Sequence, residues 1–389
     1  MAGDEDKSQM RLITTSKRSG INRRRFLRMA GGLGALTTLS GCSSSSDHKT
    51  VKYPKIVSGD HVVQWMTVPE DWDQHRSYVK KVYNRVRGWL HSLQSVIGTT
   101  LVRSDRTYGG HNGFRIKIIV EGEVSQSGSD IPGEIDGILT TTEPSPDWWG
   151  LAECSIDTGN CTNRGGGDTV RGGESVGWIN GGYGTATCRV TVNGKQRLLH
   201  CGHVFWDDCA DATHGVTGRV AVSGNERIGT VESVSVSGDY SVINGEYGGN
   251  YAATIDDNRT YPELVGYATE VACEYWNTLP RRSRPCLYKM GMTTGLTTGT
   301  IIGTGMSLTV PQCTTMQHEG IYTDCDAGQG DSGGPVFLIH EGKAYLVNMI
   351  SYYYVGTRTV CNGARVGINS AGIPAWWLVN NTDITFDSN

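Results

Sequence analysis

The sequence predicts a mainly β protein in which a small α+β domain precedes a pair of β-barrels. Glycine is abundant, with 53 residues in a chain of 389, whereas there are only 5 Phe. This composition is typical of short strands joined by tight turns. From residue 174 onward, apolar runs of strand length follow one another with turn residues between them. A chain of this length is also expected to hold two domains plus tails.

The first 42 residues resemble an export signal with a lipid attachment site. The basic run Asn22–Arg28 precedes an apolar stretch, 29–36, that is too short to cross a bilayer, and the pair resembles a twin-arginine signal. Residues 39–42, Leu-Ser-Gly-Cys, then resemble a lipobox, in which Cys42 is acylated and becomes the first residue of the mature protein. Residues 43–50 follow as a flexible polar tether. A basic start to a cytoplasmic protein is the alternative, but it leaves the position of Cys42 unexplained.

The charge of the chain is divided between this signal and the rest. Residues 1–42 hold eight Lys or Arg and three acidic residues, a net charge of +5, so the remainder of a chain at −4 carries −9. Nucleic acids and anionic membrane surfaces require a basic patch. We therefore expect no nucleic-acid partner. We expect the protein to be anchored at the outer face of the cytoplasmic membrane through the lipid on Cys42.

The cysteines predict a disulfide framework that forms after export. Ten of the 11 Cys remain once Cys42 is set aside, and none of them forms a C-x-x-C pair. An even, dispersed set is typical of disulfides in an oxidising compartment rather than of a zinc ribbon. A Cys154–Cys161 bridge would close a short loop. The pairing stays open for six others: Cys188, Cys201, Cys209, Cys273, Cys286 and Cys313.

Residues 51–146 have the pattern of a small α+β domain. Apolar residues recur at three- and four-residue steps from Val79 to Leu93 and predict a helix with one apolar face. Alternation predicts a strand at 115–121, and a second strand is expected near 135–141. We interpret this domain as a packing or folding accessory without chemistry of its own. Residues 147–173 then form a predicted glycine-rich linker.

Residues 174–389 carry the predicted barrels. No helical pattern of comparable strength precedes Ile373 in this part of the chain. Short strands separated by turn residues predict an all-β pair of barrels. The predicted strands are 185–192, 196–200, 228–236, 240–244, 298–304, 334–339 and 344–351.

The string Gly-Gln-Gly-Asp-Ser-Gly-Gly-Pro at 328–335 is the most informative stretch for chemistry. A serine nucleophile needs an exposed Oγ and neighbouring N–H groups directed at the point where the oxyanion of a tetrahedral intermediate forms. Glycines on both sides of Ser332 permit this because they accept positive φ and carry no side chain. An ordinary Gly-rich hairpin is the alternative, but the full string is rarely accidental. Ser332 is therefore the candidate nucleophile.

A serine of this kind requires a base with a pKa near neutrality, and His203 is the best placed of the ten His. It follows an apolar strand and Gly202, where a strand end can deliver it to a cleft. His200 lies within that strand and is expected to be packed or surface-facing. The alternative is a zinc site formed by His200, Cys201, His203 and Cys209. These residue types bind zinc, but their spacing is not the usual one, so no metal is expected.

The base must in turn be held by a carboxylate, and Asp239 stands at the start of an apolar strand. Burial against an imidazole is possible there. Asp256 and Asp257 are the alternatives, but their Asn and Arg neighbours indicate a solvated turn. His203, Asp239 and Ser332 therefore form the candidate catalytic triad.

These motifs resemble the chymotrypsin-type serine proteases, and most of all their compact bacterial branch of streptogrisin and α-lytic protease. The likeness lies in the order His, Asp, Ser, in the Gly-Asp-Ser-Gly-Gly-Pro string and in the Gly-His and Gly-Asp-Tyr strand ends. Residues 288–299 are also similar to the Gly-x-Thr-Thr-Gly segment of that branch. The resemblance covers about residues 172–380 and implies a chymotrypsin-like double β-barrel. It further implies a monomeric endopeptidase that hydrolyses protein or peptide substrates through an acyl-enzyme, without a cofactor.

The resemblance assigns a role to each matching residue. It implies that His203 is the general base and then acid, Asp239 its orienting carboxylate and Ser332 the nucleophile. The backbone N–H groups of Gly330 and Ser332 are implied to form the oxyanion hole. Asp331 is implied to be a buried carboxylate that shapes this loop and pairs with Lys289, since an unpaired buried carboxylate would be costly.

The implied specificity pocket departs from the family pattern. Cys325 lies one residue further from the Gly-Asp-Ser than in close bacterial relatives, and Val204 rather than Cys follows the histidine. The resemblance implies a Cys325–Cys361 bridge across a pocket wall made of Ser351, Tyr352 and Tyr353. Asp326 and Asp324 lie near the position that would bind a basic side chain, but the altered loop leaves the preferred cleavage residue open.

Other functions are compatible with parts of the pattern. A non-catalytic lipoprotein could use the fold to bind peptides or cell-envelope components, but such proteins usually lose a triad member and none is lost here. An esterase would need a Gly-x-Ser-x-Gly elbow with Ser before His. The resemblance also implies that residues 51–146 act as a folding or inhibitory pro-segment, removed by cleavage near Gly165–Gly173. A permanent two-domain enzyme at the membrane is the alternative.

Overall fold

The described part of the chain is built mainly of β-strands, as the sequence predicts. The computed structural model describes residues 49–121, 131–144, 149–151, 169–179, 181–206, 216–246, 250–256, 260–308, 319–354, 358–360 and 364–386. Within these ranges, no helix is both long enough and apolar enough to cross a membrane. Several predictions fall outside them, namely the export signal, most of the linker, and Cys42, Cys154, Cys161, Cys209, Cys313 and Cys361.

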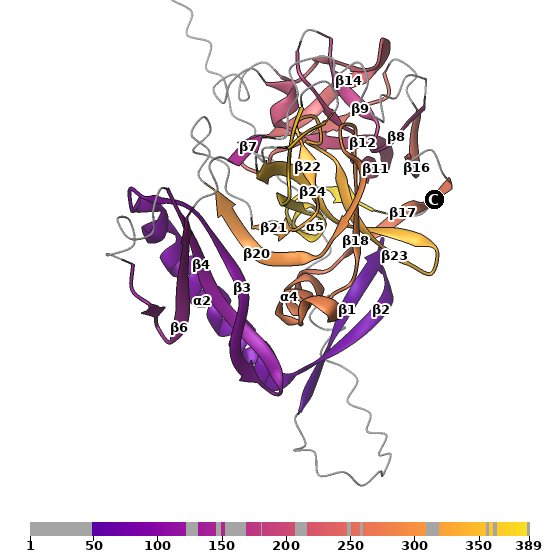
Figure 1. Cartoon of the computed structure of the whole chain (residues 1–389). Helices are drawn as coiled ribbons and strands as arrows, with labels where there is room; N and C mark the ends of the chain where they lie inside the picture. Colours follow the sequence, from indigo (N-terminus) through magenta and orange to yellow (C-terminus); the bar gives the residue numbers. More distant parts are fainter. Residues whose placement is uncertain are drawn as a thin grey trace, which may run out of the picture. The chain divides into compact units, whose positions relative to one another are not determined.

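The first described elements are a β-hairpin and a long helix (Figure 1). Strands β1 (Thr50–Ser58) and β2 (His61–Pro69) pair antiparallel, and α2 (Glu70–Ser92) follows directly. Its first turn carries Glu70, Asp71 and Asp73, whose negative charges are favourable at a helix N-terminus. The predicted helix is therefore confirmed, and it begins well before Val79.

One face of α2 packs on a sheet made of β3 (Val96–Tyr108), β4 (His111–Val120) and β6 (Ile138–Pro144), with the short β5 (Glu134–Ile135) beside β6. Strands β4 and β6 match the two predicted strands. Strand β3 was not predicted because residues on both faces of its first half are buried, so its sequence does not alternate. The helix contributes buried side chains to this core from Trp72, Val79, Val82, Tyr83 and Leu90.

Strands of the predicted accessory domain are hydrogen-bonded to strands much later in the chain. Strand β3 pairs with β20 (Ile301–Leu308), and β1 pairs with β17 (Thr260–Ala268). Arg76 of α2 lies 2.6 Å from Glu274 in a largely buried ion pair. The accessory segment and the later segment therefore share one sheet and a charged contact.

Helix α4 (Glu270–Thr278), which contains Glu274, was not expected from the sequence. Its N-cap residue Thr269 accepts a hydrogen bond from the backbone N–H of Ala272 at 3.4 Å. The nine-residue helix is rich in aromatic and polar residues of modest helix propensity, so tertiary packing decides its structure. Helix α5 (Ala375–Asn381), in contrast, lies where the sequence places a helical pattern after Ile373.

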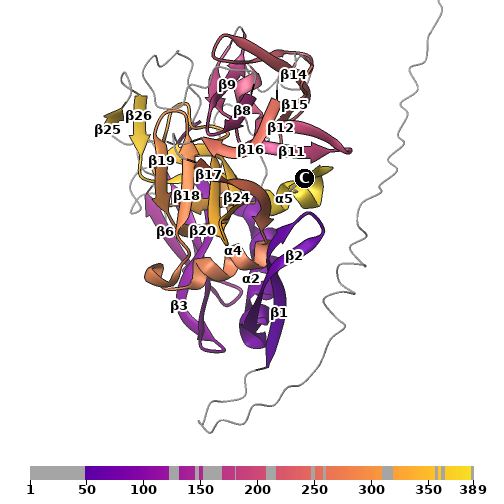
Figure 2. The same cartoon turned by 90° about the vertical axis from the view of Figure 1, so that its right-hand side faces the viewer.

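The rest of the chain forms two antiparallel systems of short strands (Figure 2), and the predicted mainly β class with barrel-like sheets is confirmed. The first system contains β9 (Ser175–Trp178), β10 (Tyr183–Thr185), β11 (Cys188–Val192), β12 (Lys195–Cys201), β13 (Val220–Ser223), β14 (Glu226–Ser235), β15 (Tyr240–Ile243) and β28 (Ile384–Thr385). The second is part of a 17-stranded sheet and contains β18 (Leu287–Gly291), β19 (Gly295–Gly299), β20, β21 (Gly320–Thr323), β23 (Pro335–His340), β24 (Lys343–Tyr354) and β27 (Ser370–Pro374).

Further strands complete the described structure. Strand β8 (Thr169–Gly172) pairs parallel with β16 (Asn250–Asp256). Strand β7 (Trp149–Leu151) pairs antiparallel with the end of β24. A separate three-stranded sheet is formed by β22 (Ala327–Gly328), β25 (Arg358–Val360) and β26 (Ala364–Gly367).

Candidate active site

The loop that carries Ser332 runs between β22 and β23 and is fixed to β24. The N–H of Gly333 donates to the Ile350 carbonyl at 2.7 Å, and the Ile350 N–H donates to the Gly334 carbonyl at 3.0 Å. Gly330 and Gly333 have φ of 94° and 88°, a region that L-residues with side chains rarely adopt. A Cβ on Gly333 would also lie 2.1 Å from the Thr185 carbonyl oxygen. The glycines around Ser332 are therefore required by backbone conformation and by close packing.

His203 and Asp239 come from the first strand system and meet Ser332 at the second. His203 begins a short 3-10 turn directly after β12, and Asp239 occupies the turn before β15 with φ of 43°, which Asp tolerates better than most residues. The Asp239 carboxylate accepts from the His203 backbone N–H at 2.9 Å. Its two oxygens lie 3.0 and 2.8 Å from His203 Nδ1, and His203 Nε2 lies 2.6 Å from Ser332 Oγ.

These contacts assign the protons of the site. An ionised carboxylate can only accept hydrogen bonds, so His203 Nδ1 carries the hydrogen and Nε2 is left to accept the Ser332 hydroxyl proton. Burial by itself lowers the pKa of His203, but the charge of Asp239 holds that pKa well above its ordinary value. The structure thus brings the three predicted residues together with the base oriented toward the hydroxyl.

The aligned triad is closed off from solvent. Ser332 and Asp239 are 0% exposed, and His203 is 1% exposed. Low local dielectric strengthens the interaction between the imidazole and the carboxylate.

Thr185 positions the predicted oxyanion-hole backbone, a role that no motif in the sequence indicates. Its hydroxyl donates to the Gly330 carbonyl at 2.7 Å, and its N–H donates to the Ser332 carbonyl at 2.6 Å. The backbone N–H groups of Gly330 and Ser332 donate to no group among the described residues. They are therefore available to an oxyanion.

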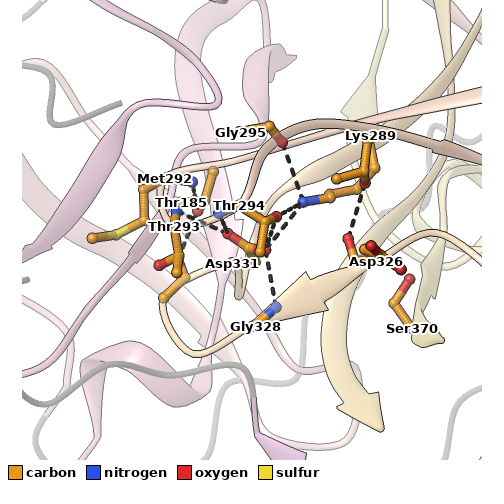
Figure 3. Close-up of polar contacts among 12 residues, drawn as sticks. Thr185, Lys289, Met292, Thr293, Thr294, Gly295, Asp326, Gly328, Asp331 and Ser370 are labelled. Atoms are coloured by element: carbon orange, nitrogen blue, oxygen red, sulfur yellow. Dashed lines mark hydrogen bonds and ion pairs between the residues drawn. The ribbon is translucent and has the colours of Figure 1, made fainter. Parts of the chain in front are cut away.

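Asp331 and Lys289 lie side by side beneath this loop (Figure 3). Both side chains are 0% exposed, and Lys289 Nζ lies 3.1 Å from Asp331 Oδ2. Lys289 also donates to Thr294 Oγ1 and to the Gly295 carbonyl, the latter at 3.2 Å. The ammonium group therefore has three partners, which compensates for its loss of water.

The carboxylate of Asp331 is as fully satisfied as its partner. Oδ1 accepts from the backbone N–H groups of Thr293 at 3.0 Å and Thr294 at 3.2 Å. Oδ2 accepts from the Gly328 N–H at 3.0 Å and from Thr294 Oγ1 at 2.5 Å. In the sequence this Thr-Thr segment is recognisable only as a resemblance, whereas in the structure its backbone and hydroxyl groups hold the nucleophile loop through Asp331.

Most of the predicted specificity-pocket residues that the structure describes are buried. The buried residues among them are Cys325, Ser351, Tyr352 and Tyr353, exposed by 0%, 0%, 4% and 1%. Within the described structure, Ser351 Oγ has no hydrogen-bond partner. The carbonyl of Asp326 accepts from Thr297 Oγ1 at 2.9 Å, so its backbone ties the loop to β19. Cys361 lies outside the described residues.

The cysteines differ from the predicted framework. All five described cysteines carry free thiols, namely Cys188, Cys201, Cys273, Cys286 and Cys325. A Cys188–Cys201 bridge, one of the open alternatives, is therefore not formed, because the register of β11 and β12 places Cys188 opposite Leu199 instead. Cys325 is likewise a free thiol and not half of the implied Cys325–Cys361 clamp.

Cys201 lies beside the triad. Its Sγ lies 3.9 Å from His203 Nε2 and 3.4 Å from His200 Nδ1. Burial raises the pKa of the Cys201 thiol and lowers the pKa of His200 to about 4. Both groups are thus neutral packing residues behind the catalytic imidazole, and His200 is buried rather than surface-facing.

Comparisons with known proteins give likenesses to solved structures only. No family model matches the chain, and no curated protein matches it. A serine protease specific for glutamic acid matches with 18% identity and a TM-score of 0.40, covering 56% of this chain and 100% of its own. Cellulomonas bogoriensis chymotrypsin matches with 21% identity and 0.40, and a Nocardiopsis protease with 20% and 0.41, each covering 57% of this chain and 100% of its own.

Proposed function

We propose that this chain is a serine endopeptidase that is exported and held at the membrane by a lipid. The observation that carries the proposal is the continuous hydrogen-bonded line from Asp239 through His203 to Ser332, with a Nε2–Oγ distance of 2.6 Å. Three side chains brought together from separate turns in this geometry are able to activate a hydroxyl.

The geometry supports acyl transfer in two steps, acylation of Ser332 and hydrolysis of the acyl-enzyme. Ser332 Oγ attacks the carbonyl carbon of a peptide bond while His203 Nε2 takes its proton. The N–H groups of Gly330 and Ser332 stabilise the oxyanion, and Asp239 stabilises the imidazolium. His203 then protonates the leaving amine, and water repeats the sequence to release the acid.

The two alternatives have less support. A peptide-binding scaffold without catalysis would not require a hydroxyl within hydrogen-bond distance of an imidazole whose tautomer is fixed by a buried carboxylate. An esterase would use the same triad, but the Ser-Gly-Gly turn between β22 and β23 is not the strand-to-helix elbow of that class.

Labelling with a fluorophosphonate probe tests this function. We expect the probe to form a covalent adduct that mass spectrometry locates on Ser332, because only an activated serine attacks phosphorus at a useful rate. Ser332→Ala should give no adduct, and His203→Ala should react far more slowly. An adduct on another serine, or equal labelling of wild type and His203→Ala, would contradict the proposal.

The pH dependence of hydrolysis should show the effect of Asp239 on His203. Only the neutral imidazole accepts the serine proton, so kcat/KM rises as pH increases through the pKa of His203, with a midpoint above pH 6.5. Asp239→Asn removes the charge that raises this pKa, and burial alone then lowers it. We expect the acidic limb to move to lower pH and kcat to fall by about 10⁴-fold. Chromogenic-peptide hydrolysis between pH 5 and 9 measures both, and an unmoved limb would disprove the role given to Asp239.

Cys42 is proposed to carry the lipid anchor, because it ends the export signal and is the odd cysteine of the chain. We expect Cys42→Ser to move the protein from the membrane fraction to the soluble fraction. Cys286→Ser is the matched control, since Cys286 is an exposed free thiol of the described structure. Retention of Cys42→Ser in the membrane fraction would indicate a different anchor.

A further inference from the structure

Helix α2 has an exposed stripe of aromatic and basic side chains. Tyr78, Lys81, Arg85 and Trp89 are exposed and follow one another at steps of three and four residues, a spacing that places side chains on one face of a helix. Tyr78 and Trp89 are 49% and 44% exposed. The opposite face of α2 packs on the sheet of β3, β4 and β6 (Figure 1). These four residues therefore form an outward stripe, directed away from that sheet.

The basic residues of α2 divide into two sets. Arg76 and Lys80 are directed at helix α4, where Arg76 lies 2.6 Å and Lys80 3.2 Å from the carboxylate of Glu274 in largely buried ion pairs. Lys81 and Arg85 lie on the outward stripe instead. The first set thus holds the accessory segment to the later part of the chain, whereas the second set faces solvent.

Two residues of the outward stripe contact Asp136 at the surface. The Tyr78 hydroxyl donates to the Asp136 carbonyl at 3.0 Å, and Arg85 forms an ion pair with the Asp136 carboxylate. The two side chains of this pair are 59% and 47% exposed, and exposed ion pairs contribute little to stability. Arg85 can therefore exchange this carboxylate for another anion at small cost.

The charge of the chain is unevenly distributed between the accessory segment and the rest. Residues 49–121 contain 12 Lys or Arg and 6 Asp or Glu, a net charge of +6, whereas residues 122–389 contain 15 and 29, a net charge of −14. From Gln74 to Ser104 there are six basic residues and no acidic residue. The overall negative charge therefore conceals a basic segment of the kind that anionic surfaces attract.

The proposed lipid anchor precedes α2 by a short length of chain in space. The backbone N–H of Glu70, the first residue of α2, donates to the Lys49 carbonyl at 2.8 Å. Lys49 is seven residues after Cys42, a span of at most about 25 Å. Trp89 is 19 residues after Glu70, which corresponds to about 28 Å along the helix. A lipid on Cys42 would therefore hold the whole stripe close to the bilayer.

We propose that the outward stripe of α2 is a docking surface for an anionic lipid bilayer. Lys81 and Arg85 bind the phosphate groups of the lipids. The rings of Tyr78 and Trp89 lie at the level of the headgroups, where aromatic side chains that carry a polar group are favoured. The inference rests on the proposed function for the lipid on Cys42. Docking gives the anchored enzyme one orientation relative to the membrane, which a single anchoring point cannot do.

The stripe orients the anchored enzyme but does not retain an unanchored one. Two cations and two rings give weak binding by themselves, since peripheral binding grows with the buried apolar area and the number of charges. A lipid on the same chain raises their effective concentration at the bilayer. The expectation that Cys42→Ser is recovered in the soluble fraction is therefore unchanged.

Binding to lipid vesicles tests the charges of the stripe. The full chain in its Cys42→Ser form is mixed at low salt with vesicles of phosphatidylcholine, with or without phosphatidylglycerol, and the bound fraction is measured by sedimentation. We expect stronger binding to the anionic vesicles. Lys81→Gln with Arg85→Gln should weaken that binding about fivefold for each charge removed. Lys195→Gln with Lys343→Gln, which alters exposed lysines of β12 and β24, is the matched control and should bind as the parent does.

Fluorescence tests whether Trp89 reaches the bilayer. Lipids brominated in their acyl chains quench tryptophan only at short range. We expect anionic vesicles of such lipids to quench the Cys42→Ser form more than the same form with Trp89→Phe. Trp65→Phe is the matched control, because Trp65 is 42% exposed but lies on strand β2. Equal quenching with and without Trp89, or a larger loss with Trp65→Phe, would overturn the docking surface.

The outcomes separate this inference from the proposed function. All forms carry the same residues before Lys49, so a difference between them arises from the substituted positions. Equal binding of anionic vesicles by the parent and by Lys81→Gln with Arg85→Gln would overturn the docking surface and leave the peptidase and the anchor intact. Stripe-dependent binding of heparin without binding of vesicles would also overturn it, because the partner would be another polyanion. A wild type whose Cys42 carries no lipid by mass spectrometry would refute the anchor, while the vesicle result still decides the docking surface.

Discussion

Ser332→Ala is expected to lose nearly all peptide hydrolysis, with a fall in kcat on the order of 10⁶-fold. His203→Ala should lose about as much, and the double variant should be no worse than either single variant. The reason is that the hydroxyl and the imidazole act as one unit joined at 2.6 Å, so removing either partner removes the whole activation. Initial rates of hydrolysis of a chromogenic peptide by each variant test this.

Ser223→Ala is the matched control. Ser223 is also fully buried, and its hydroxyl donates to the Ser175 carbonyl at 3.0 Å, away from the triad. Its substitution should cost stability of about 1 kcal/mol and leave kcat close to that of the parent. Near-parental activity in Ser332→Ala, or a double variant far worse than both single variants, would show that the triad has been assigned wrongly.

The triad residues could be selected from the sequence because each stands in a local context that restricts its geometry. Glycines flank Ser332, a strand end precedes His203, and Asp239, a residue type that tolerates positive φ, stands in the turn directly before a strand. Their distances could not be predicted, since residues 36 and 129 positions apart meet only through the pairing of distant strands. Thr185 illustrates the limit: its role depends on two carbonyls far along the chain.

The fold shows the same division between local and non-local information. The apolar stripe of α2 and the alternation in β4 are local patterns, and both elements were predicted. Helix α4 and strand β3 lack such a pattern, because α4 is stabilised by contacts such as Asn277 with the Leu101 carbonyl and β3 is buried on both faces. Strand β7 exists only through its pairing with β24, so a glycine-rich linker was the natural sequence interpretation of its surroundings.

Lys289→Met is expected to destabilise the protein by about 3–5 kcal/mol, because it removes one partner of a fully buried ion pair and leaves Asp331 as an uncompensated charge. Methionine keeps most of the volume of the lysine side chain, so the loss is not explained by a cavity. Asp331 also holds the loop of Ser332 through Gly328 and Thr294. We therefore expect kcat to fall together with the free energy of unfolding, which chemical denaturation measures.

Two further variants distinguish the buried charge from a general effect of losing a lysine. Lys343→Met breaks a pair with Glu263 of nearly the same length, 3.2 Å, but these side chains are 47% and 53% exposed, so the expected loss is at most about 1 kcal/mol. The double variant Lys289→Met with Asp331→Asn removes both charges while keeping an acceptor oxygen for the Thr293 and Thr294 N–H groups. It should be more stable than Lys289→Met alone, because the cost arises from leaving one charge without the other. Equal losses in Lys289→Met and Lys343→Met would show that the pair beneath the nucleophile loop contributes no more than a surface contact.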